Sequence, residues 1–242
     1  IYTHRLARRL QEEFLKLPPE MQQIYELEMY VAPAYRMMRN QGIEVDREAA
    51  EDLKDKYHLR LHEISNDIIL DYRCSPTKNR EIAQALVDNG VPLTEKTATG
   101  EWKLTKEILD GLDHPLANAV KEYRETAKLA NTYVENILQL SEKDGRLHAE
   151  TNQIGADTGR SSMSKPNLQN VPQRQGTVIR SLLVAGEGNV LISCDYSQQE
   201  LRILAHFSQD PALIAMFDSD EDPFVYIGSM LYPDDPLTGK ND

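Results

Sequence analysis

Apolar side chains recur at intervals of three and four residues through most of the first 140 positions, which predicts a succession of amphipathic helices. A helix over residues 3–16 is expected to stop before Pro18, because proline lacks the amide hydrogen that a continuing helix needs. A second helix is expected from about residue 20 to residue 40, with Pro33 inside it as a possible point of bending. The run Ile43–Val45 then predicts a short strand.

Residues 46–140 are interpreted as an almost entirely helical unit. Asp46 is a suitable N-cap, since its carboxylate can accept a hydrogen bond from an amide of the first turn. The helix that it starts is expected to reach about Tyr72. Three further helices are expected in this unit, at residues 80–89, 105–111 and 116–140.

The pattern changes after residue 140. The dipeptide Asp144-Gly145 is typical of a turn, and residues 147–151 are expected to be extended. The apolar run Val190–Cys194 predicts a buried strand, and the polar-apolar pattern after it predicts one helix over residues 199–217.

The composition, 40% hydrophobic and 27% charged residues, is that of an ordinary globular protein. No apolar run approaches the ~20 residues of a membrane span, so no membrane partner is expected. Cys74 and Cys194 have no metal-ligand spacing, and we expect them to be reduced, structural thiols. The chain opens at Ile1 without the pattern of a signal peptide, and we expect it to be part of a longer reading frame.

Charge is unevenly distributed along the chain. The net charge of −12 argues at first against nucleic acid as a partner. Between residues 145 and 180, however, five basic residues outnumber two acidic ones, whereas between residues 181 and 242 eleven acidic residues outnumber two basic ones. A phosphate-facing segment beside a cation-holding segment would have this distribution, and so would chance.

Asp195 stands at the end of the predicted strand and directly before the predicted helix. A carboxylate there is a hard oxygen ligand suited to Mg²⁺. The amides at the helix start, those of residues 197–199, would favour phosphate. Together these groups suit phosphoryl transfer. The alternative is that Asp195 is simply an N-cap.

A second polar element combines Thr158-Gly159-Arg160 with the segment Pro166–Pro172. Arginine and side-chain amides can donate hydrogen bonds to minor-groove acceptors that all Watson–Crick pairs share, which would test pair geometry without reading sequence. The alternative is a loop whose amides satisfy one another. The amides in question are Asn167, Gln169 and Asn170.

A third element is a basic stripe on the helix predicted at residues 116–140. Its members recur at intervals of three and four, so they share one face; they are Lys121, Arg124, Lys128 and Asn131. Such a stripe can follow a phosphate backbone. Intervening glutamates also fit the alternative of a solvated face.

Taken together, these motifs closely resemble those of family A DNA polymerases, the DNA polymerase I-like group. The resemblance rests on Thr-Gly-Arg, on Pro-Asn-Leu-Gln-Asn-Val-Pro, and on Asp-Tyr-Ser-Gln-Gln-Glu-Leu-Arg at 195–202, which is similar to that family's motif A. It is specific over residues 145–217 and looser over residues 20–140, and residues 1–16 resemble the last helix of the preceding exonuclease-like domain.

The resemblance implies roles in nucleotide addition. Asp195 would coordinate two catalytic Mg²⁺ ions, and Tyr196 would offer its backbone carbonyl to one of them. Glu200 would be a steric gate against a 2′-hydroxyl, which favours deoxynucleotides. The incoming deoxynucleoside triphosphate would lie along Ser197, Gln198, Gln199 and Glu200.

The resemblance also implies contacts with primer–template DNA. Arg160 would donate a hydrogen bond in the minor groove at the primer terminus. The remaining DNA contacts would come from Asn167, Gln169, Asn170, Arg124, Lys128 and Asn131.

The implied fold class is α+β, with a mostly helical thumb attached to part of a palm that has an antiparallel sheet, in an incomplete right-hand architecture. The implied domains are the end of the exonuclease-like domain (1–17), the entry helix and strand of the palm (18–45), the thumb (46–140), the palm with motif A (141–222) and the start of the fingers (223–242).

The implied function is template-directed DNA polymerisation in replication or repair, in the cytoplasm of a bacterium or a phage-infected cell, with an organelle as the alternative location. Two positions depart from the family pattern: Gln199 replaces an aliphatic residue and Phe224 replaces a histidine. The family's fingers helix and later His-Asp-Glu motif are missing from these residues, so we expect the chain alone not to polymerise. A catalytically inactive duplex-binding remnant remains an alternative. A single-subunit RNA polymerase is another, although Glu200 and Thr-Gly-Arg argue against it. Nothing in the sequence indicates a processivity factor.

Overall fold

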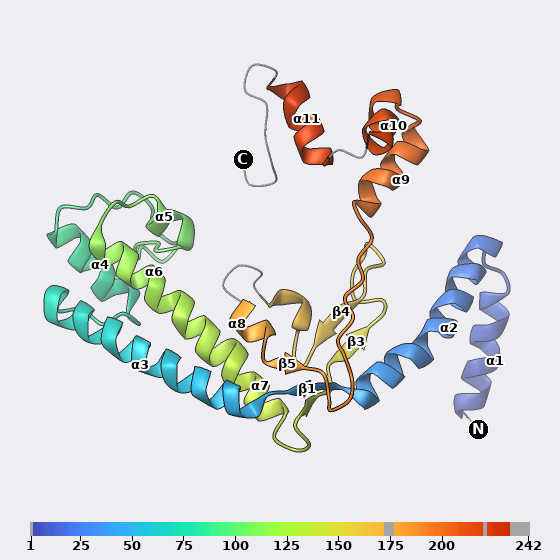
Figure 1. Cartoon of the computed structure of the whole chain (residues 1–242), viewed down its shortest axis with the longest axis horizontal. Coiled ribbons are helices and arrows are strands. Elements are labelled where there is room, and N and C mark those ends of the chain that lie inside the picture. The colour runs from blue at the N-terminus through green and yellow to red at the C-terminus, as the bar shows by residue number, and fades with distance from the viewer. Residues whose placement is uncertain (1, 172–176, 220–221, 233–242) are drawn as a thin grey trace. The chain divides into compact units, whose positions relative to one another are not determined.

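The computed structural model describes residues 2–171, 177–219 and 222–232 (Figure 1). The chain divides into two compact units, Ile1–Val190 and Leu191–Asp242. None of the helices in the described ranges combines the length and the apolar character of a membrane-spanning segment.

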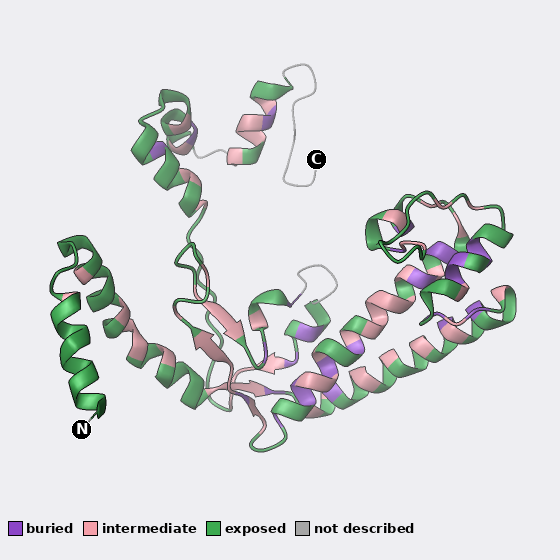
Figure 2. Cartoon of the chain, turned by 180° about the vertical axis from the view of Figure 1, so that it is seen from behind, coloured by how far each residue is buried: buried purple, intermediate pink, exposed green. Residues whose placement is uncertain are grey.

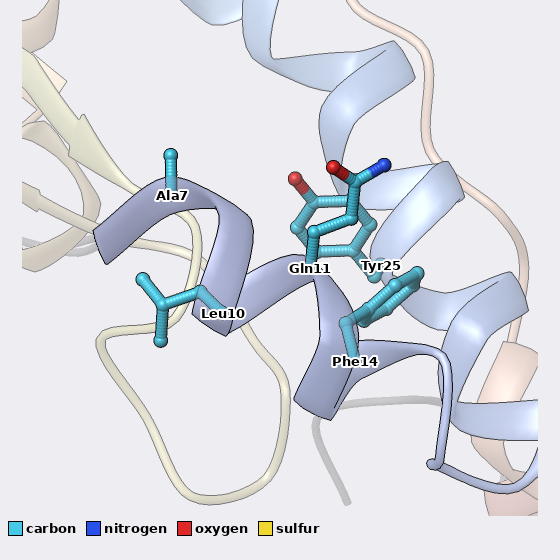
Figure 3. A pocket seen from close by; sticks show the side chains of 5 residues that line it. All are labelled: Ala7, Leu10, Gln11, Phe14 and Tyr25. Carbon is cyan, nitrogen blue, oxygen red and sulfur yellow. The ribbon is translucent and has the colours of Figure 1, made fainter. Parts of the chain in front are cut away.

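Two exposed helices open the first unit, α1 (Tyr2–Phe14) and α2 (Pro19–Gln41). Pro33 lies inside α2 without ending it. The rings of Phe14 and Tyr25 pack against each other in a tilted arrangement, with centroids 4.7 Å apart and planes inclined by 53°. Figure 3 shows the cavity beside them, of about 600 Å³, which is lined by Ala7, Leu10, Gln11, Phe14 and Tyr25. Neither helix has a buried residue, so few contacts hold this pair.

The helical unit predicted for residues 46–140 is present. Its elements are α3 (Arg47–Tyr72), α4 (Asn79–Asp88), α5 (Lys106–Asp110), α6 (Pro115–Ala127), the π-helix η1 (Lys128–Val134) and α7 (Glu135–Leu140). The Asp46 carboxylate accepts a hydrogen bond of 2.9 Å from the Ala49 amide, which confirms the predicted N-cap. The helix predicted over residues 116–140 is likewise present, but its middle is a π-helix, which periodicity did not reveal.

Two apolar clusters lie in the first unit (Figure 2). One joins α3, α4, α5 and α6, and its fully buried members include Ile68, Ile82, Leu86, Leu109, Leu116 and Val120. The other joins the base of the helical unit to a small sheet, and its members include Val45, Val134, Ile137, Leu147 and Ile179. The second cluster anchors the helices to the sheet, because strand and helix residues are buried in it together.

The small sheet has the central strand β1 (Ile43–Val45), flanked by β2 (Arg146–Leu147) and β5 (Leu183–Val184). Both pairings are antiparallel, with Val45 opposite Leu183 in one of them. The predicted strand at residues 43–45 and the predicted antiparallel sheet are therefore confirmed.

A separate hairpin is formed by β3 (Glu150–Asn152) and β4 (Ser162–Ser164). The 3₁₀-helix η2 (Leu168–Asn170) and the short helix α8 (Thr177–Arg180) follow it. The segment 147–151, expected to be extended, is divided between the small sheet and this hairpin. Local pattern predicts extended backbone, but the partner strands decide which sheet each residue joins.

The second unit has three helices in its described residues: α9 (Gln199–Ser208), α10 (Pro211–Asp218) and α11 (Pro223–Leu231). The single helix predicted over residues 199–217 is wrong. Gln209 takes a left-handed conformation with φ 54°, and the Asp210 carboxylate then accepts hydrogen bonds from the amides of Ala212 and Leu213. Asp-Pro is a start signal for a new helix, and it ends the first one here.

The buried strand predicted at Val190–Cys194 is also wrong. These residues join no ladder in the described chain, and Val190 and Ile192 are 78% and 81% exposed. An apolar run forms a strand only where a neighbouring strand pairs with it, and Val190–Cys194 has no such pairing in the described residues. Cys74 is buried, and burial raises the pKa of its thiol, but Cys194 is exposed, so it is not the structural thiol that we expected.

Candidate functional site

Arg160 lies in the connection between β3 and β4, on the first unit. The connection turns at Gly159, whose φ of +77° favours glycine, and the Gly159 amide donates a 3.0 Å hydrogen bond to the Ala156 carbonyl. Arg160 is exposed beyond this turn. A tight turn that presents an exposed arginine is an arrangement suited to a ligand outside the chain.

The side chains of Asn167 and Gln169 have hydrogen-bond partners within the chain, and both residues are exposed. The Asn167 side chain accepts a 3.1 Å hydrogen bond from the Gln169 amide and so caps η2. The Gln169 side chain donates a 3.2 Å hydrogen bond to the Ser161 carbonyl, the residue after Arg160. The structure therefore brings the two predicted motif segments together through Gln169.

Asn170 is tied to the helical unit. The Tyr133 hydroxyl donates a 2.9 Å hydrogen bond to the Asn170 backbone carbonyl, and Asn170 is an exposed residue. A cavity of about 200 Å³ lies at this junction, and its polar lining residues are Thr132, Tyr133, Asn136, Asn167 and Asn170. Amide and hydroxyl groups from two segments thus converge on one small depression.

The residues of the predicted basic stripe lie in different environments. Arg124 turns into the helical unit, where its guanidinium donates hydrogen bonds to the Leu104 carbonyl and, at 2.7 Å, to the Asn79 side chain. Burial lowers the pKa of Arg124 from its usual value. Lys121 forms an ion pair of 3.2 Å with Asp110.

Lys128 and Asn131 are exposed, and both lie in the π-helix η1. A π-helix has more residues per turn than an α-helix, so it changes which residues share a face. The environments differ mainly because the Arg124 guanidinium binds Leu104 and Asn79 inside the helical unit, whereas Lys128 and Asn131 are exposed.

Asp195 and Tyr196 lie on the second unit, directly before α9, and both are exposed. Gln198 adopts a left-handed conformation with φ 53° at the N-cap of α9. Arg202 donates a 2.9 Å hydrogen bond from Nε to the Ser197 carbonyl. Its guanidinium carbon also lies 4.5 Å from the centroid of the Phe217 ring.

Arg202 therefore links the turn before α9 to α10. The sequence did not predict this role, because its contacts with Ser197 and Phe217 depend on the folded structure. A depression of about 450 Å³ lies beside this turn, and it is lined by Tyr196, Ser197, Gln199, Arg202, Ile203, His206 and Phe207. Gln199 and Glu200 form the first turn of α9, where Glu200 is exposed.

The chemistry of the donor atoms fits part of a divalent metal site. The Asp195 carboxylate and the Tyr196 carbonyl are hard oxygen ligands, and Mg²⁺ is commonly held by one or two carboxylates together with water and substrate phosphates. Among the described residues, no cluster of three or more His, Cys, Asp or Glu side chains could hold a metal ion. Asp195 and Tyr196 would therefore supply only some of the ligands.

The chain resembles curated bacterial polymerases. It is 32% identical over 250 residues to DNA polymerase I of Chloroflexus aurantiacus, covering 98% of this chain and 26% of that protein. It is 37% identical over 203 residues to DNA polymerase I of Helicobacter pylori (81% and 22%) and 33% identical over 242 residues to the thermostable DNA polymerase I of Thermus thermophilus (96% and 29%). The chain thus spans about a quarter of the length of these relatives.

The fold is similar to that of the POL domain of Pol1 from M. smegmatis, solved in complex with DNA primer-template and dNTP. The TM-score is 0.73 at 30% sequence identity, covering 85% of this chain and 38% of that one. This likeness is consistent with the α+β class and with part of a right-hand architecture. The family model described as DNA polymerase family A matches residues 47–236. The chain therefore belongs to DNA polymerase family A.

Proposed function

We propose that this chain is the part of a template-directed DNA polymerase that holds the primer–template duplex and presents the first catalytic aspartate. The proposal rests mainly on one hydrogen bond, from the Gln169 side chain to the Ser161 carbonyl. This bond joins the segment Asn167–Asn170 to the turn Thr158-Gly159-Arg160. The two segments that it holds together carry an exposed arginine and three exposed side-chain amides. Such donors suit minor-groove acceptors that are common to all base pairs.

The proposed DNA contacts follow from exposure. Arg160, Asn167, Gln169 and Asn170 would face the new base pairs, and Lys128 with Asn131 would contact the duplex backbone. Arg124 is proposed to support the helical unit beneath that surface, since its guanidinium is bound to Asn79 and Leu104.

The second unit would bind the deoxynucleoside triphosphate. Asp195 and the Tyr196 carbonyl would hold divalent ions, which we propose to be Mg²⁺ and which stabilise the attacking and leaving oxygens when bound. The turn of Ser197, Gln198 and Gln199 would orient the triphosphate, and Glu200 would exclude a 2′-hydroxyl. In the reaction, the primer 3′-oxygen forms a bond to the α-phosphorus as the bond to pyrophosphate breaks, and the hydroxyl proton passes to solvent.

The domain boundaries proposed for this chain are those predicted from its sequence. Residues 46–140 would be the thumb, residues 18–45 and 141–222 parts of the palm, residues 1–17 the end of an exonuclease-like domain, and residues 223–242 the start of the fingers. The common burial of Val45, Val134 and Leu147 supports a thumb rooted in the palm sheet. Bacterial relatives also support a cytoplasmic location.

The test is primer extension by the whole protein, compared with its Asp195→Ala variant. We expect Asp195→Ala to abolish extension and to leave primer–template binding within about twofold, because the side chain would act on the triphosphate and not on the duplex. Asp218→Ala is the control, since Asp218 is an exposed aspartate at the end of α10.

Extension by Asp195→Ala at the normal rate would refute the role of Asp195. Duplex binding by the whole protein without any extension would instead favour the alternative of an inactive duplex-binding remnant. Failure to bind a primer–template duplex would refute both functions.

A further inference from the structure

Gln153 joins two segments that are far apart in the sequence. It is the first residue after β3, and its Nε2 atom donates hydrogen bonds to both the backbone carbonyl of Glu28, at 2.9 Å, and the Glu28 carboxylate, at 2.7 Å. Glu28 lies in the middle of α2. A single amide group therefore binds the entry of the β3–β4 connection to this helix.

Glu150 makes a second link on the same side. Its carboxylate forms an ion pair with Arg39 of α2 at 2.7 Å and a second ion pair with Lys165, the residue after β4, at 3.3 Å. Because Glu150 and Ser164 are opposite each other in the hairpin, this carboxylate lies where both strands meet the helix. The base of the hairpin is thus held by charge, and its far end is held by Gln153.

One face of α2 carries both links. Glu28, Tyr35 and Arg39 follow the helical period, and Glu28, Val31, Ala32 and Tyr35 are the half-buried positions in this part of an otherwise exposed helix. Pro33 cannot donate a hydrogen bond to the Met29 carbonyl, so the helix ladder is interrupted next to the carbonyl that Gln153 binds. The face of α2 that carries Glu28 and Arg39 therefore offers polar groups to residues 150–153, beside half-buried apolar side chains.

The connection that carries Arg160 is held at both of its ends. It begins at Gln153, which is bound to Glu28, and it ends at Ser161, whose carbonyl accepts the hydrogen bond from Gln169. Arg160 lies directly before the second of these points. The two hydrogen bonds limit how far the connection can move, although much of it is exposed.

We propose that Gln153 is a positioning residue for Arg160: by donating to Glu28 it uses helix α2 to hold the Arg160 connection in place against the primer terminus. The role of Arg160 at the primer terminus rests on the proposed function. The link between Gln153 and Glu28 does not. In this arrangement α2 supports the site that recognises the primer terminus, although none of its residues would touch DNA.

The experiment compares two variants of similar size with opposite hydrogen-bonding character. Gln153→Lys keeps a donor and adds attraction to the Glu28 carboxylate, whereas Gln153→Glu removes the donor and adds repulsion. Gln23→Ala, at an exposed glutamine of the same helix, is the control. Hydrogen exchange is measured over residues 150–164, together with binding of duplexes whose primer ends in a matched or a mismatched base pair.

For Gln153→Glu we expect faster exchange over residues 150–164, and a preference for the matched primer end that is about threefold to tenfold smaller, the scale of one hydrogen bond. Gln153→Lys and Gln23→Ala should keep both properties. Unchanged exchange in Gln153→Glu would overturn the link to α2. Faster exchange with an unchanged preference would overturn the positioning role. Absence of any preference in the unaltered chain would instead refute the role of Arg160 in the proposed function.

Discussion

His148 is held between Asp144 and the end of α2. Its Nε2 atom lies 2.9 Å from the Asp144 carboxylate, and its Nδ1 atom lies 2.6 Å from the Arg39 carbonyl. Both partners are acceptors, so both contacts are hydrogen bonds only when the imidazole is protonated on both nitrogens. The Arg39 carbonyl and then Asp144 raise the pKa of His148, and the hydrogen bond from His148 lowers the pKa of Asp144.

These directions predict a pH dependence of stability. His148 stabilises the fold fully below its unfolded pKa of about 6.5, and this contribution is lost as pH rises through the higher folded pKa. Asp144 stabilises the fold above its unfolded pKa of about 3.9, and this contribution is lost as pH falls through the lower folded value. The pair should therefore stabilise most between about pH 4 and pH 6.5.

The measurement is thermal unfolding of the unaltered chain and of His148→Ala at pH 6 and pH 8. The loss of stability in the variant should be larger at pH 6 than at pH 8, and the difference should be small because both side chains are partly exposed. His4→Ala, on the exposed helix α1, is the control. An equal loss at both pH values would show that protonation of His148 does not stabilise the fold.

Gly42→Ala should destabilise the fold strongly. Gly42 has φ +62°, and a Cβ atom there would lie 2.8 Å from both His148 Cε1 and the Leu147 carbonyl oxygen. With ψ −179° this backbone conformation is essentially restricted to glycine and costs another residue about 1–3 kcal/mol, and the clash adds to it. Gly100→Ala is a matched control, because Gly100 has φ +84° but nothing within 4 Å of its added Cβ. Denaturant unfolding should show a larger loss for Gly42→Ala, and equal losses would contradict the predicted clash.

Arg124→Ala should reduce the stability of the helical unit by about 1–3 kcal/mol, because it leaves the Leu104 carbonyl and the Asn79 side chain without their donor. Arg80→Ala, at an exposed position of α4, should change stability by less than about 0.5 kcal/mol. Urea unfolding measures both. If Arg124→Ala unfolds like the unaltered chain but binds DNA less tightly, Arg124 contacts DNA directly.

Lys128→Ala should weaken duplex binding without changing stability, because Lys128 is exposed. Removing one phosphate contact lowers the slope of log affinity against log salt by about one. Fluorescence anisotropy over a range of salt concentrations measures the slope. Lys56→Ala, at an exposed position of α3, is the control. The same slope for Lys128→Ala and the unaltered chain would exclude a phosphate contact.

Glu200→Ala, in the whole protein, should relax discrimination against ribonucleotides, since the proposed gate would no longer meet a 2′-hydroxyl. The ratio of kcat/KM for deoxynucleotide and ribonucleotide insertion is the measurement. We expect a decrease in this ratio of at least tenfold, about 1.4 kcal/mol of discrimination. Glu187→Ala, at an exposed residue of the first unit, should leave the ratio unchanged. A ratio that stays the same in Glu200→Ala would remove Glu200 from the gate.

Elements that depend on local interactions were predictable from the sequence. The N-cap at Asp46, the long helix α3 after it and the short strand β1 follow from capping, periodicity and residue shape within a few positions. The motif strings at Thr158–Arg160 and Asp195–Arg202 also identified the family, because they are specific residues in a specific order.

Tertiary structure decided what depends on distant partners. Val190–Cys194 has the composition of a buried strand, yet it pairs with no strand in the described chain. Arg124 has the spacing of a surface cation, yet Asn79 and Leu104 draw it inward. Gln153 carries no local signal at all, because its partner Glu28 lies on helix α2, 125 positions earlier in the sequence. Burial, ion pairing and long-range hydrogen bonds arise from which segments meet, and a sequence pattern describes only one segment at a time.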